Sequence, residues 1–447
     1  MHRRKRAGYG DHMTGRLSEA FAAAADFLSR QDPRADPPEH VGRLLAATGL
    51  DRDIGGEDGT RRSDTIGLLR AAARFGGVFR LRSRAAPGMA FFGGFAAPDL
   101  ARSDAESLRV SLSGAGITPS EAFRACIGEG IEYVAQFETH RLRTGNARDA
   151  EAWNRRTYPP ELFEWTGQVD GIDWVEAECL SDGESFWIPA PLAMRSASPP
   201  SEVDARRWAV GNGCAAGPTA AAARCAALYE TIERDAVALW WRGGRPPLEV
   251  SQPELDALGA TELLAVVRQG QADYETTVLQ IPCDFGLTCL AAFSFDHEGG
   301  FAGGYACHPD PQRACRSAIR EMCQMELGNE IIAARQDSSG STAPAADAPG
   351  RERRDLVTPD APAFRPAGPS SLALQGVPAF GEVVARLAEA GFQAYAVDFI
   401  EPASEIPVAK IVVPGLQPYP SSFVTRRLVA SMTEYTDSAY APHIDLF

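Results

Sequence analysis

The feature that most constrains this chain is a helical pattern that occurs three times and can be aligned on Glu129, Glu230 and Glu321. Eleven positions before each glutamate stands a residue that commonly caps a helix N-terminus. The position after that residue holds proline in two of the three copies, and proline is favoured at the first helical position. The capping residues are Thr118, Thr219 and Asp310. The sequence therefore predicts three helices that begin at equivalent points of an internal repeat.

One stripe of each predicted helix carries small residues first and polar residues after them. The positions seven and four before the aligned glutamate hold alanine or serine, and the position three after it holds Glu132, Glu233 or Gln324. These offsets fall on one side of a helix. The small residues are Ala122, Ala125, Ala223, Ala226, Ala314 and Ser317. We therefore expect the small residues to allow close approach, with the acids lying where that approach leads.

Five carboxylates and one carboxamide at a shared site would repel one another, and a hard divalent cation such as Mg²⁺ is the usual remedy. Magnesium in proteins is normally bound by one or two carboxylates together with substrate phosphates. Arg234 follows Glu230 by one helical turn, and its planar guanidinium suits phosphate oxygens. The pattern indicates a nucleotide held mainly through Mg²⁺. The alternative is a structural repeat with surface acids, in which Glu230 and Arg234 form an ordinary ion pair.

The segment that leads into the second helix also fits a dinucleotide-binding fingerprint. Gly211, Gly213 and Ala216 match G-x-G-x-x-[GA] after a predicted strand at Arg207–Val210. That fold requires a parallel strand soon after the helix, whereas this helix is predicted to continue through Trp241. The other two repeats lack these glycines, so this interpretation is the weaker one.

Composition narrows the class of protein. The formal net charge of -15 argues against a protein that holds nucleic acid by neutralising its phosphates. No apolar run approaches the ~18 residues of a membrane span and no signal peptide is indicated, so we expect a cytoplasmic protein. The nine cysteines include no C-x-x-C pair, which removes the usual zinc-site spacing.

Hydrophobic periodicity predicts an α/β protein in which strands alternate with helices. Residues 1–75 are expected to form a small helical appendage, and residues 436–447 a C-terminal tail. Residues 337–371, rich in Ala, Pro, Ser and Asp, are expected to form a mobile loop. Predicted strands cover 77–81, 108–112, a hairpin over 174–189, 274–281, 288–295, 301–306, 393–399 and 408–413. Further predicted helices cover 15–30, 40–50, 65–75, 253–269 and 380–390.

These residues resemble the YcaO superfamily, whose ATP site is built from E-x-x-E-type helices in a fold without a Walker motif. The matching segments are Glu129 with Glu132, Glu230 with Glu233 and Arg234, and Glu321 with Gln324, together with KIVVPGLQ at 410–417. The resemblance covers roughly residues 75–435. It implies an α/β fold with a YcaO-like core of mixed β-sheets and repeated strand-turn-helix units over residues 76–435.

The resemblance also assigns roles at the site. It implies that ATP and Mg²⁺ are bound by one set of residues, and that the glutamates among them hold the metal. Arg234 would contact phosphate and act in catalysis with Glu230 and Glu233. The cofactor-binding set is Glu129, Glu132, Glu230, Glu233, Arg234, Arg320, Glu321 and Gln324.

The activity that the resemblance implies is ATP-dependent activation of a backbone amide in a ribosomally synthesised precursor peptide. Cyclodehydration of Cys, Ser or Thr to an azoline is the first expectation, and thioamide formation is the second. A nucleotide-binding accessory protein that assists another modifying enzyme is the alternative from a different class. A leader-peptide-binding partner protein is expected, and a homodimer would be in keeping with a soluble enzyme.

Overall fold

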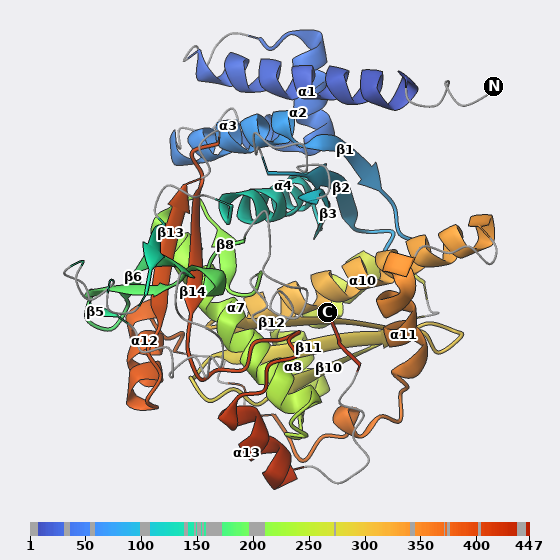
Figure 1. Cartoon of the computed structure of the whole chain (residues 1–447). Coiled ribbons are helices and arrows are strands. Elements are labelled where there is room, and N and C mark those ends of the chain that lie inside the picture. Colours follow the sequence, from blue (N-terminus) through green and yellow to red (C-terminus); the bar gives the residue numbers. More distant parts are fainter. Residues whose placement is uncertain are drawn as a thin grey trace, which may run out of the picture.

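The computed structural model describes residues 8–30, 36–53, 59–98, 108–137, 142–146, 149, 153, 156–157, 172–195, 211–271, 274–339, 345–370, 372, 376–400, 404–435 and 444–447. Three β-sheets with helices packed against them make up this part of the chain (Figure 1). The predicted fold class, an α/β core of mixed sheets with a helical N-terminal region, is confirmed.

Three helices precede the first sheet and pack onto the first repeated unit. They are α1 (Gly8–Ser29), α2 (Glu39–Thr48) and α3 (Gly59–Arg74), with a short 3-10 helix at Leu50–Asp53. Phe21 of α1 stacks on Phe123 of α4 (Pro119–Ala135) at 5.8 Å between ring centroids. One hydrophobic core therefore runs from the N-terminal helices into α4.

The three predicted repeats are strand-turn-helix units. Strand β3 (Val110–Gly116) leads into α4, β8 (Cys214–Ala216) into α7 (Ala220–Trp241), and β12 (Phe301–His308) into α10 (Pro311–Ser339). The predicted N-caps are confirmed, because each capping side chain accepts a hydrogen bond from a backbone N–H of the first turn. The distances are 3.2 Å at Thr118, 3.1 Å at Thr219 and 2.9 Å at Asp310.

Strand and helix approach closely in each unit, as the small residues predict. A Cβ atom added at Gly114 would lie 2.3 Å from the carbonyl oxygen of Ala122, and one at Gly304 would lie 2.2 Å from that of Ala318. In the second unit, a Cβ at Gly217 would lie 2.7 Å from the nitrogen of Ala223. The glycines and alanines therefore bring each strand against its own helix.

The three unit strands are edge strands of three different sheets. The first sheet has the order β1-β2-β3, the second β12-β11-β10-β9, and the third β5-β7-β6-β13-β14-β8 with β4 paired to β6. Among the described residues, β3, β12 and β8 each have a partner strand on one side only. The other strands are β1 (Gly76–Leu81), β2 (Ala90–Ala96), β4 (Arg143–Gly145), β5 (Arg156–Thr157), β6 (Ile172–Cys179), β7 (Ser185–Pro189), β9 (Leu248–Glu249), β10 (Glu275–Ile281), β11 (Thr288–Phe295), β13 (Tyr395–Ile400) and β14 (Pro407–Val412).

Several element predictions need correction. The helix predicted over 253–269 is two helices, α8 (Gln252–Ala257) and α9 (Ala260–Arg268), because Gly259 adopts a left-handed conformation with φ 72° between them. Strand β2 was not predicted. The hairpin over 174–189 is confirmed as β6 and β7, which pair antiparallel. Two further helices are α12 (Phe380–Glu389) and α13 (Arg426–Tyr435). The predicted strand at Arg207–Val210 lies outside the described residues.

Residues 337–371 are not one continuous loop. Helix α10 continues to Ser339, and helix α11 (Ala348–Leu356) follows. Both apolar packing and ion pairs attach this segment, since the ring of Phe364 stacks on that of Phe293 at 4.3 Å between centroids and Arg354 lies 3.2 Å from Asp296. Low apolar content over the whole segment misled the prediction, because its few apolar residues, Val357, Ala363 and Phe364 among them, lie in the hydrophobic core.

Within the described residues, no helix combines the length and apolar character that a bilayer crossing requires.

Candidate active site

The first glutamate of each unit accepts a hydrogen bond from the strand of its own unit. Glu129 accepts from the backbone N–H of Ser113 at 2.7 Å, and Glu321 from that of Tyr305 at 3.4 Å. In the second unit, Glu230 accepts a hydrogen bond from the backbone N–H of Gly213. This bond lowers the pKa of Glu230, but burial raises it by more. Because the unit strands are sheet edges, these carboxylates satisfy N–H groups that have no strand partner.

The second polar residue of each helix reaches the strand of the next unit. Glu132 accepts from the N–H of Ala216 at 2.8 Å, so the first helix is tied to the second strand. Glu233 accepts from the N–H of Cys307 at 3.1 Å, which ties the second helix to the third strand. The amide of Gln324 donates to the hydroxyl of Ser113 at 2.5 Å and ties the third helix to the first strand. The three units therefore form a closed, pseudo-threefold arrangement, which we call the carboxylate ring.

Burial raises the pKa of all five carboxyl groups of the ring. It raises the pKa of Glu129 to about 7 against the opposing hydrogen bonds from Ser113. It raises the pKa of Glu132 to about 8, with further contributions from the charges of Glu230 and Glu129. For Glu230, Glu233 and Glu321, burial is again the largest cause of a raised pKa. The ring therefore concentrates negative charge that its surroundings do not fully compensate.

Two cations lie against the ring. Arg234 is 3.4 Å from Glu230 and 3.7 Å from Glu233, and its Nε atom is buried without a hydrogen-bond partner among the described residues. The ring of Phe447 covers the guanidinium at 3.6 Å from its centroid. Burial lowers the pKa of Lys410 to about 8, although the nearby Cys214 and Glu230 oppose this effect. Among the described residues, Arg234, Lys410 and Arg320 lower the pKa of ring carboxyl groups, and these three cations are fewer than the five carboxylates.

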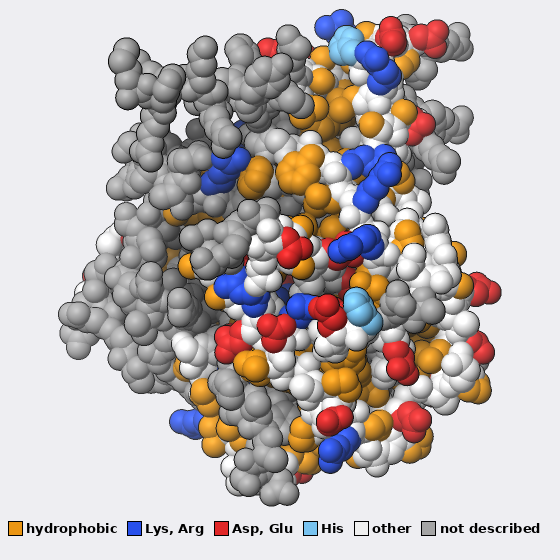
Figure 2. Space-filling view, turned by 90° about the vertical axis from the view of Figure 1, so that its right-hand side faces the viewer, with side chains coloured by type: hydrophobic (Ala, Val, Ile, Leu, Met, Phe, Trp, Pro, Cys, Tyr) orange, Lys and Arg blue, Asp and Glu red, His pale blue; other side chains and the backbone are white. Residues whose placement is uncertain are grey.

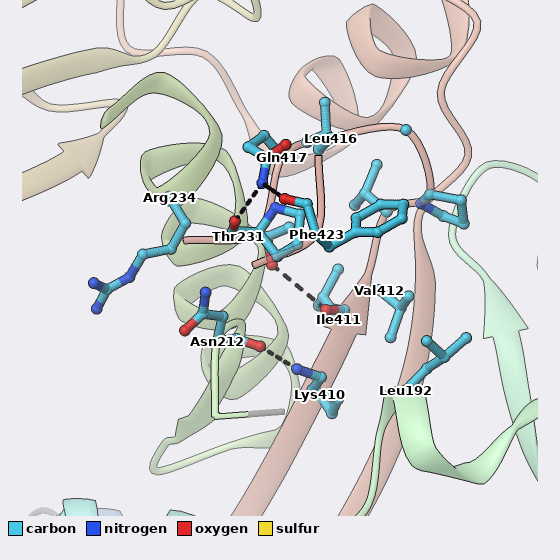
Figure 3. A pocket seen from close by; sticks show the side chains of 14 residues that line it. Leu192, Asn212, Thr231, Arg234, Lys410, Ile411, Val412, Leu416, Gln417 and Phe423 are labelled. Atoms are coloured by element: carbon cyan, nitrogen blue, oxygen red, sulfur yellow. Dashed lines mark hydrogen bonds between the residues drawn. The ribbon is translucent and has the colours of Figure 1, made fainter. Parts of the chain in front are cut away.

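A small cavity of about 80 Å³ adjoins these cations (Figure 3). Arg234, Asn212 and Lys410 lie on one side of it, and the side chains of Ile411, Val412, Leu416 and Phe423 line the other side (Figure 3). Lys410 donates to the carbonyl oxygen of Asn212, and Gln417 donates to that of Phe423 at 2.8 Å. The cavity therefore offers an apolar wall next to the charged ring.

On the molecular surface, acidic and basic side chains gather in the middle of the face that Figure 2 shows.

A second cavity of about 230 Å³ is lined by Arg320 together with Arg316, Ser317 and Glu121. Arg320 influences the ring through its charge, since it is the largest influence that lowers the pKa of Glu321 against burial.

The donor set fits Mg²⁺ that is shared with a nucleotide. Among the described residues, no three His, Cys, Asp or Glu side chains form a cluster able to hold a metal. Each ring carboxylate instead accepts a hydrogen bond from a different backbone N–H. Because Mg²⁺ commonly takes one or two carboxylates and completes its coordination with phosphate and water, spaced acids beside Arg234 suit a Mg²⁺–nucleotide complex.

The structure brings together most of the site residues predicted from the sequence. Those in or directly against the carboxylate ring are Glu129, Glu132, Glu230, Glu233, Arg234, Glu321 and Gln324. Arg320 lies in the second cavity, and its charge lowers the pKa of Glu321. Their ligand-binding roles stay predictions.

Lys410 and the strand N–H groups were not predicted as part of the site. A single lysine within the apolar stretch VAKIVV was the available signal, because a charge inside a buried strand requires a partner. The backbone donors had no sequence signal, because any residue except proline supplies an N–H. His443, which could serve as a base, lies outside the described residues.

The dinucleotide-binding interpretation is excluded by topology. Strand β8, which carries Ala216, pairs antiparallel with β14, and the strand after α7 belongs to a different sheet. The fold and the ring instead define a class of α/β protein in which carboxylates carried by three helices, rather than a glycine-rich loop, gather at the candidate site.

The chain belongs to the YcaO family. A family model described as YcaO cyclodehydratase, ATP- and Mg²⁺-binding, matches residues 113–417. The matched residues contain the second and third repeated units and the first from Ser113 onward. The resemblance seen in the sequence and the prediction of ATP and Mg²⁺ as cofactors are confirmed.

Two relatives match about half of the chain. An uncharacterized protein of Methanothermobacter thermautotrophicus is 27% identical over 247 residues, which are 53% of this chain and 62% of that protein. An uncharacterized protein in the tfuA 3′ region of Rhizobium leguminosarum bv. trifolii is 26% identical over 264 residues, or 55% of this chain and 61% of that protein. The match thus spans less than two thirds of the length of either relative.

Solved structures share the fold at low sequence identity. A heterocyclase in complex with substrate and cofactor has a TM-score of 0.65 and 19% identity, with 86% of this chain and 56% of that chain covered. YcaO from Methanopyrus kandleri, bound with AMPPCP and Mg²⁺, has a TM-score of 0.55 and 20% identity, with 86% and 92% covered. A chain of the E. coli microcin synthetase McbBCD complex has a TM-score of 0.52 and 14% identity, with 76% and 88% covered.

Proposed function

We propose that this protein is an ATP- and Mg²⁺-dependent enzyme that activates a backbone amide of a ribosomally synthesised peptide. Cyclodehydration of Cys, Ser or Thr to an azoline is the reaction that we favour. The observation that carries the proposal is the carboxylate ring, where five acids with raised pKa values and Arg234 suit a Mg²⁺–nucleotide complex. Membership of the YcaO family and the heterocyclase fold relationship support it.

The ring residues would hold Mg²⁺ and the phosphate groups in place. Glu129, Glu132, Glu230, Glu233 and Glu321 supply carboxylates for the metal, and Gln324 keeps the first and third units joined through Ser113. Arg234 is held by Phe447 and by the two neighbouring acids, so its guanidinium is pre-positioned for phosphate. When bound, ATP supplies the phosphoryl group that turns the amide oxygen into a leaving group.

The peptide itself supplies the remaining groups for ring formation. The thiol or hydroxyl of a Cys, Ser or Thr side chain adds to the carbonyl carbon of the preceding amide. The carbonyl oxygen departs as phosphate, and loss of the amide proton leaves a carbon–nitrogen double bond. The contribution of the protein is positioning and charge neutralisation in a buried site.

The test combines phosphate release with product mass. Purified protein receives ATP, Mg²⁺, a precursor peptide and its leader-binding partner. We expect ATP-dependent phosphate release and a mass decrease of one water for each ring. A mass increase that corresponds to replacement of oxygen by sulfur, with a sulfur source present, would identify thioamide formation instead. Nucleotide binding without turnover for any peptide would favour the accessory protein.

Glu230→Ala and Glu233→Ala are expected to abolish phosphate release while the protein stays folded. Glu389→Ala is the matched control, because Glu389 is an exposed glutamate on α12, outside the site. If both ring variants released phosphate at the rate of the control, the assignment of the site would be wrong.

A further inference from the structure

Strand β1 belongs to a stretch of unusual charge. Residues 74–98 contain four arginines, Arg74, Arg80, Arg82 and Arg84, and no aspartate or glutamate. The whole chain has 59 acidic and 44 basic residues. Arg84 lies 3.9 Å from Glu330, so the attraction of this stretch for an acidic partner rests on Arg80 and Arg82.

Strand β1 is also the outer edge of the first sheet. Among the described residues it pairs with β2 alone, and Figure 1 shows it in the upper right part of the molecule, below α1, although α10 extends further to the right. An exposed sheet edge carries backbone N–H and C=O groups that can accept a further strand. Figure 2, which views the molecule from that side, shows basic side chains beside hydrophobic ones above the central mixed-charge area.

The two faces of this edge differ in chemistry. Phe79 is 43% exposed, and its ring lies against Phe95 at 6.2 Å between centroids. The neighbouring Arg80 points to the other face, where its guanidinium lies 5.8 Å from the ring of Phe92. Continued alternation places Arg82 on the same side as Arg80. An added strand with alternating apolar and acidic side chains would match both faces at once.

The sheet register connects this edge to the carboxylate ring. Phe79 is paired with Gly93, and Gly93 is paired with Ser113, which binds both Glu129 and Gln324. Neighbouring strands lie about 4.8 Å apart, so the backbone at Phe79 is about 10 Å from that at Ser113. One end of a peptide held at β1 can therefore reach the ring within a few extended residues.

We propose that the edge and both faces of β1 bind an extended acidic segment of the precursor peptide as an added strand. This proposal rests on the proposed function, since it names the surface on which the substrate of the carboxylate ring is held. Backbone hydrogen bonds to β1 supply affinity, and the arginines together with Phe79 select the sequence pattern.

A model peptide tests the surface without any need for catalysis. The probe is a fluorescein-labelled peptide of about ten residues, the length of a long strand, with alternating valine and glutamate. Lysine replaces glutamate in one control peptide, and a second control has the same composition in two blocks. We expect fluorescence anisotropy to show saturable binding of the alternating acidic peptide that weakens with salt. Equal binding of either control would overturn the proposal, as would no binding at low salt.

Variants locate the binding. Reversal of both charges, Arg80→Glu with Arg82→Glu, should weaken binding of the acidic probe at least about tenfold. Phe79→Ser should weaken it about threefold or more through loss of the aromatic contact. Arg43→Glu is the matched control, because Arg43 on α2 has a side chain that is 75% exposed and lies outside the sheet. Equal losses for the control and for the double variant would place the binding elsewhere and refute the assignment.

Hydrogen exchange provides a readout that is independent of affinity. Bound acidic probe should slow amide exchange within Gly76–Leu81 of the full-length protein. Binding without protection of β1 would contradict strand addition. Protection that rises with protein concentration in the absence of peptide would show that a second copy of the chain covers the edge, which also overturns the proposal.

These outcomes separate the inference from the proposed function. Probe binding at β1 with no ATP turnover on any precursor would leave the docking surface intact and reject the proposed enzyme activity. Normal processing of a precursor by the Arg80→Glu, Arg82→Glu variant, at unchanged KM for the peptide, would reject the docking surface and leave the activity intact.

Discussion

Replacement of Glu132 by glutamine should make the metal-free protein more stable at alkaline pH. Burial raises the pKa of Glu132 from an ordinary value of 4.5 to about 8. This difference corresponds to about 5 kcal/mol of unfavourable free energy for the ionised form, an upper bound by order of magnitude. A glutamine removes the charge but keeps an oxygen that can accept from the N–H of Ala216.

The sign of the effect follows from proton linkage. Because the folded pKa is the higher one, the contribution of Glu132 to stability is complete below about pH 4.5 and is lost as the pH rises to about 8. The Glu132→Gln variant has no such loss, so its advantage over the wild type grows across the same window. With about 2.1 cal/mol/K of unfolding entropy per residue over 447 residues, each kcal/mol shifts Tm by about 1 °C.

The assay is thermal unfolding of the wild type, Glu132→Gln and the exposed control Glu389→Gln from about pH 4.5 to 8.5 without divalent metal. We expect equal Tm values at the acidic end and a gain of up to about 5 °C for Glu132→Gln at pH 8. Mg²⁺ with ATP should then raise the Tm of the wild type more than that of the variant. A lower Tm for Glu132→Gln at pH 8, or a difference that does not change with pH, would refute the reasoning.

Three further substitutions test the fold and the site. Gly304→Ala should lower the unfolding free energy by about 2 to 4 kcal/mol in chemical denaturation, because its Cβ would lie 2.2 Å from the carbonyl oxygen of Ala318. The control Gly328→Ala should be neutral or slightly stabilising, because no atom lies within 4 Å of the added Cβ. Arg234→Lys should reduce phosphate release about a hundredfold with little change in Tm, because an ammonium group cannot reproduce the planar guanidinium. An undiminished rate would show that Arg234 is not part of the site. Phe447→Ala should reduce phosphate release about threefold to tenfold through loss of the ring 3.6 Å from the Arg234 guanidinium, and an unchanged rate would show that this contact does not position the arginine.

Local rules predicted the repeated helices correctly. The caps at Thr118, Thr219 and Asp310 and the small residues before each glutamate depend on neighbours within one unit, so a single sequence contains the necessary information. The same holds for the β6–β7 hairpin, whose alternation and turn lie in one stretch. These parts of the fold were therefore accessible without a structure.

The joining of the units could not be predicted in this way. The contact from Glu132 to Ala216 connects residues 84 positions apart, and that from Gln324 to Ser113 connects residues 211 positions apart. Each uses an N–H or hydroxyl of an edge strand, and the sequence does not tell which strand ends a sheet. Lys410 was missed for a related reason, because its position beside Glu230 depends on β14 pairing with β8.

The position four residues after each aligned glutamate makes a near-symmetric ring differ in charge between its units. In the first unit Tyr133 donates to the carbonyl oxygen of Leu108 at 2.6 Å, and in the third Met325 accepts from the N–H of Gly303 at 3.2 Å. Both side chains are thus used on the backbone near their own strands. In the second unit the same position is Arg234, which faces the carboxylates of Glu230 and Glu233. Arg234 therefore contributes to a charge asymmetry that Gln324, which replaces a glutamate in the third unit, also increases. We expect the phosphates of the nucleotide to lie toward the second unit.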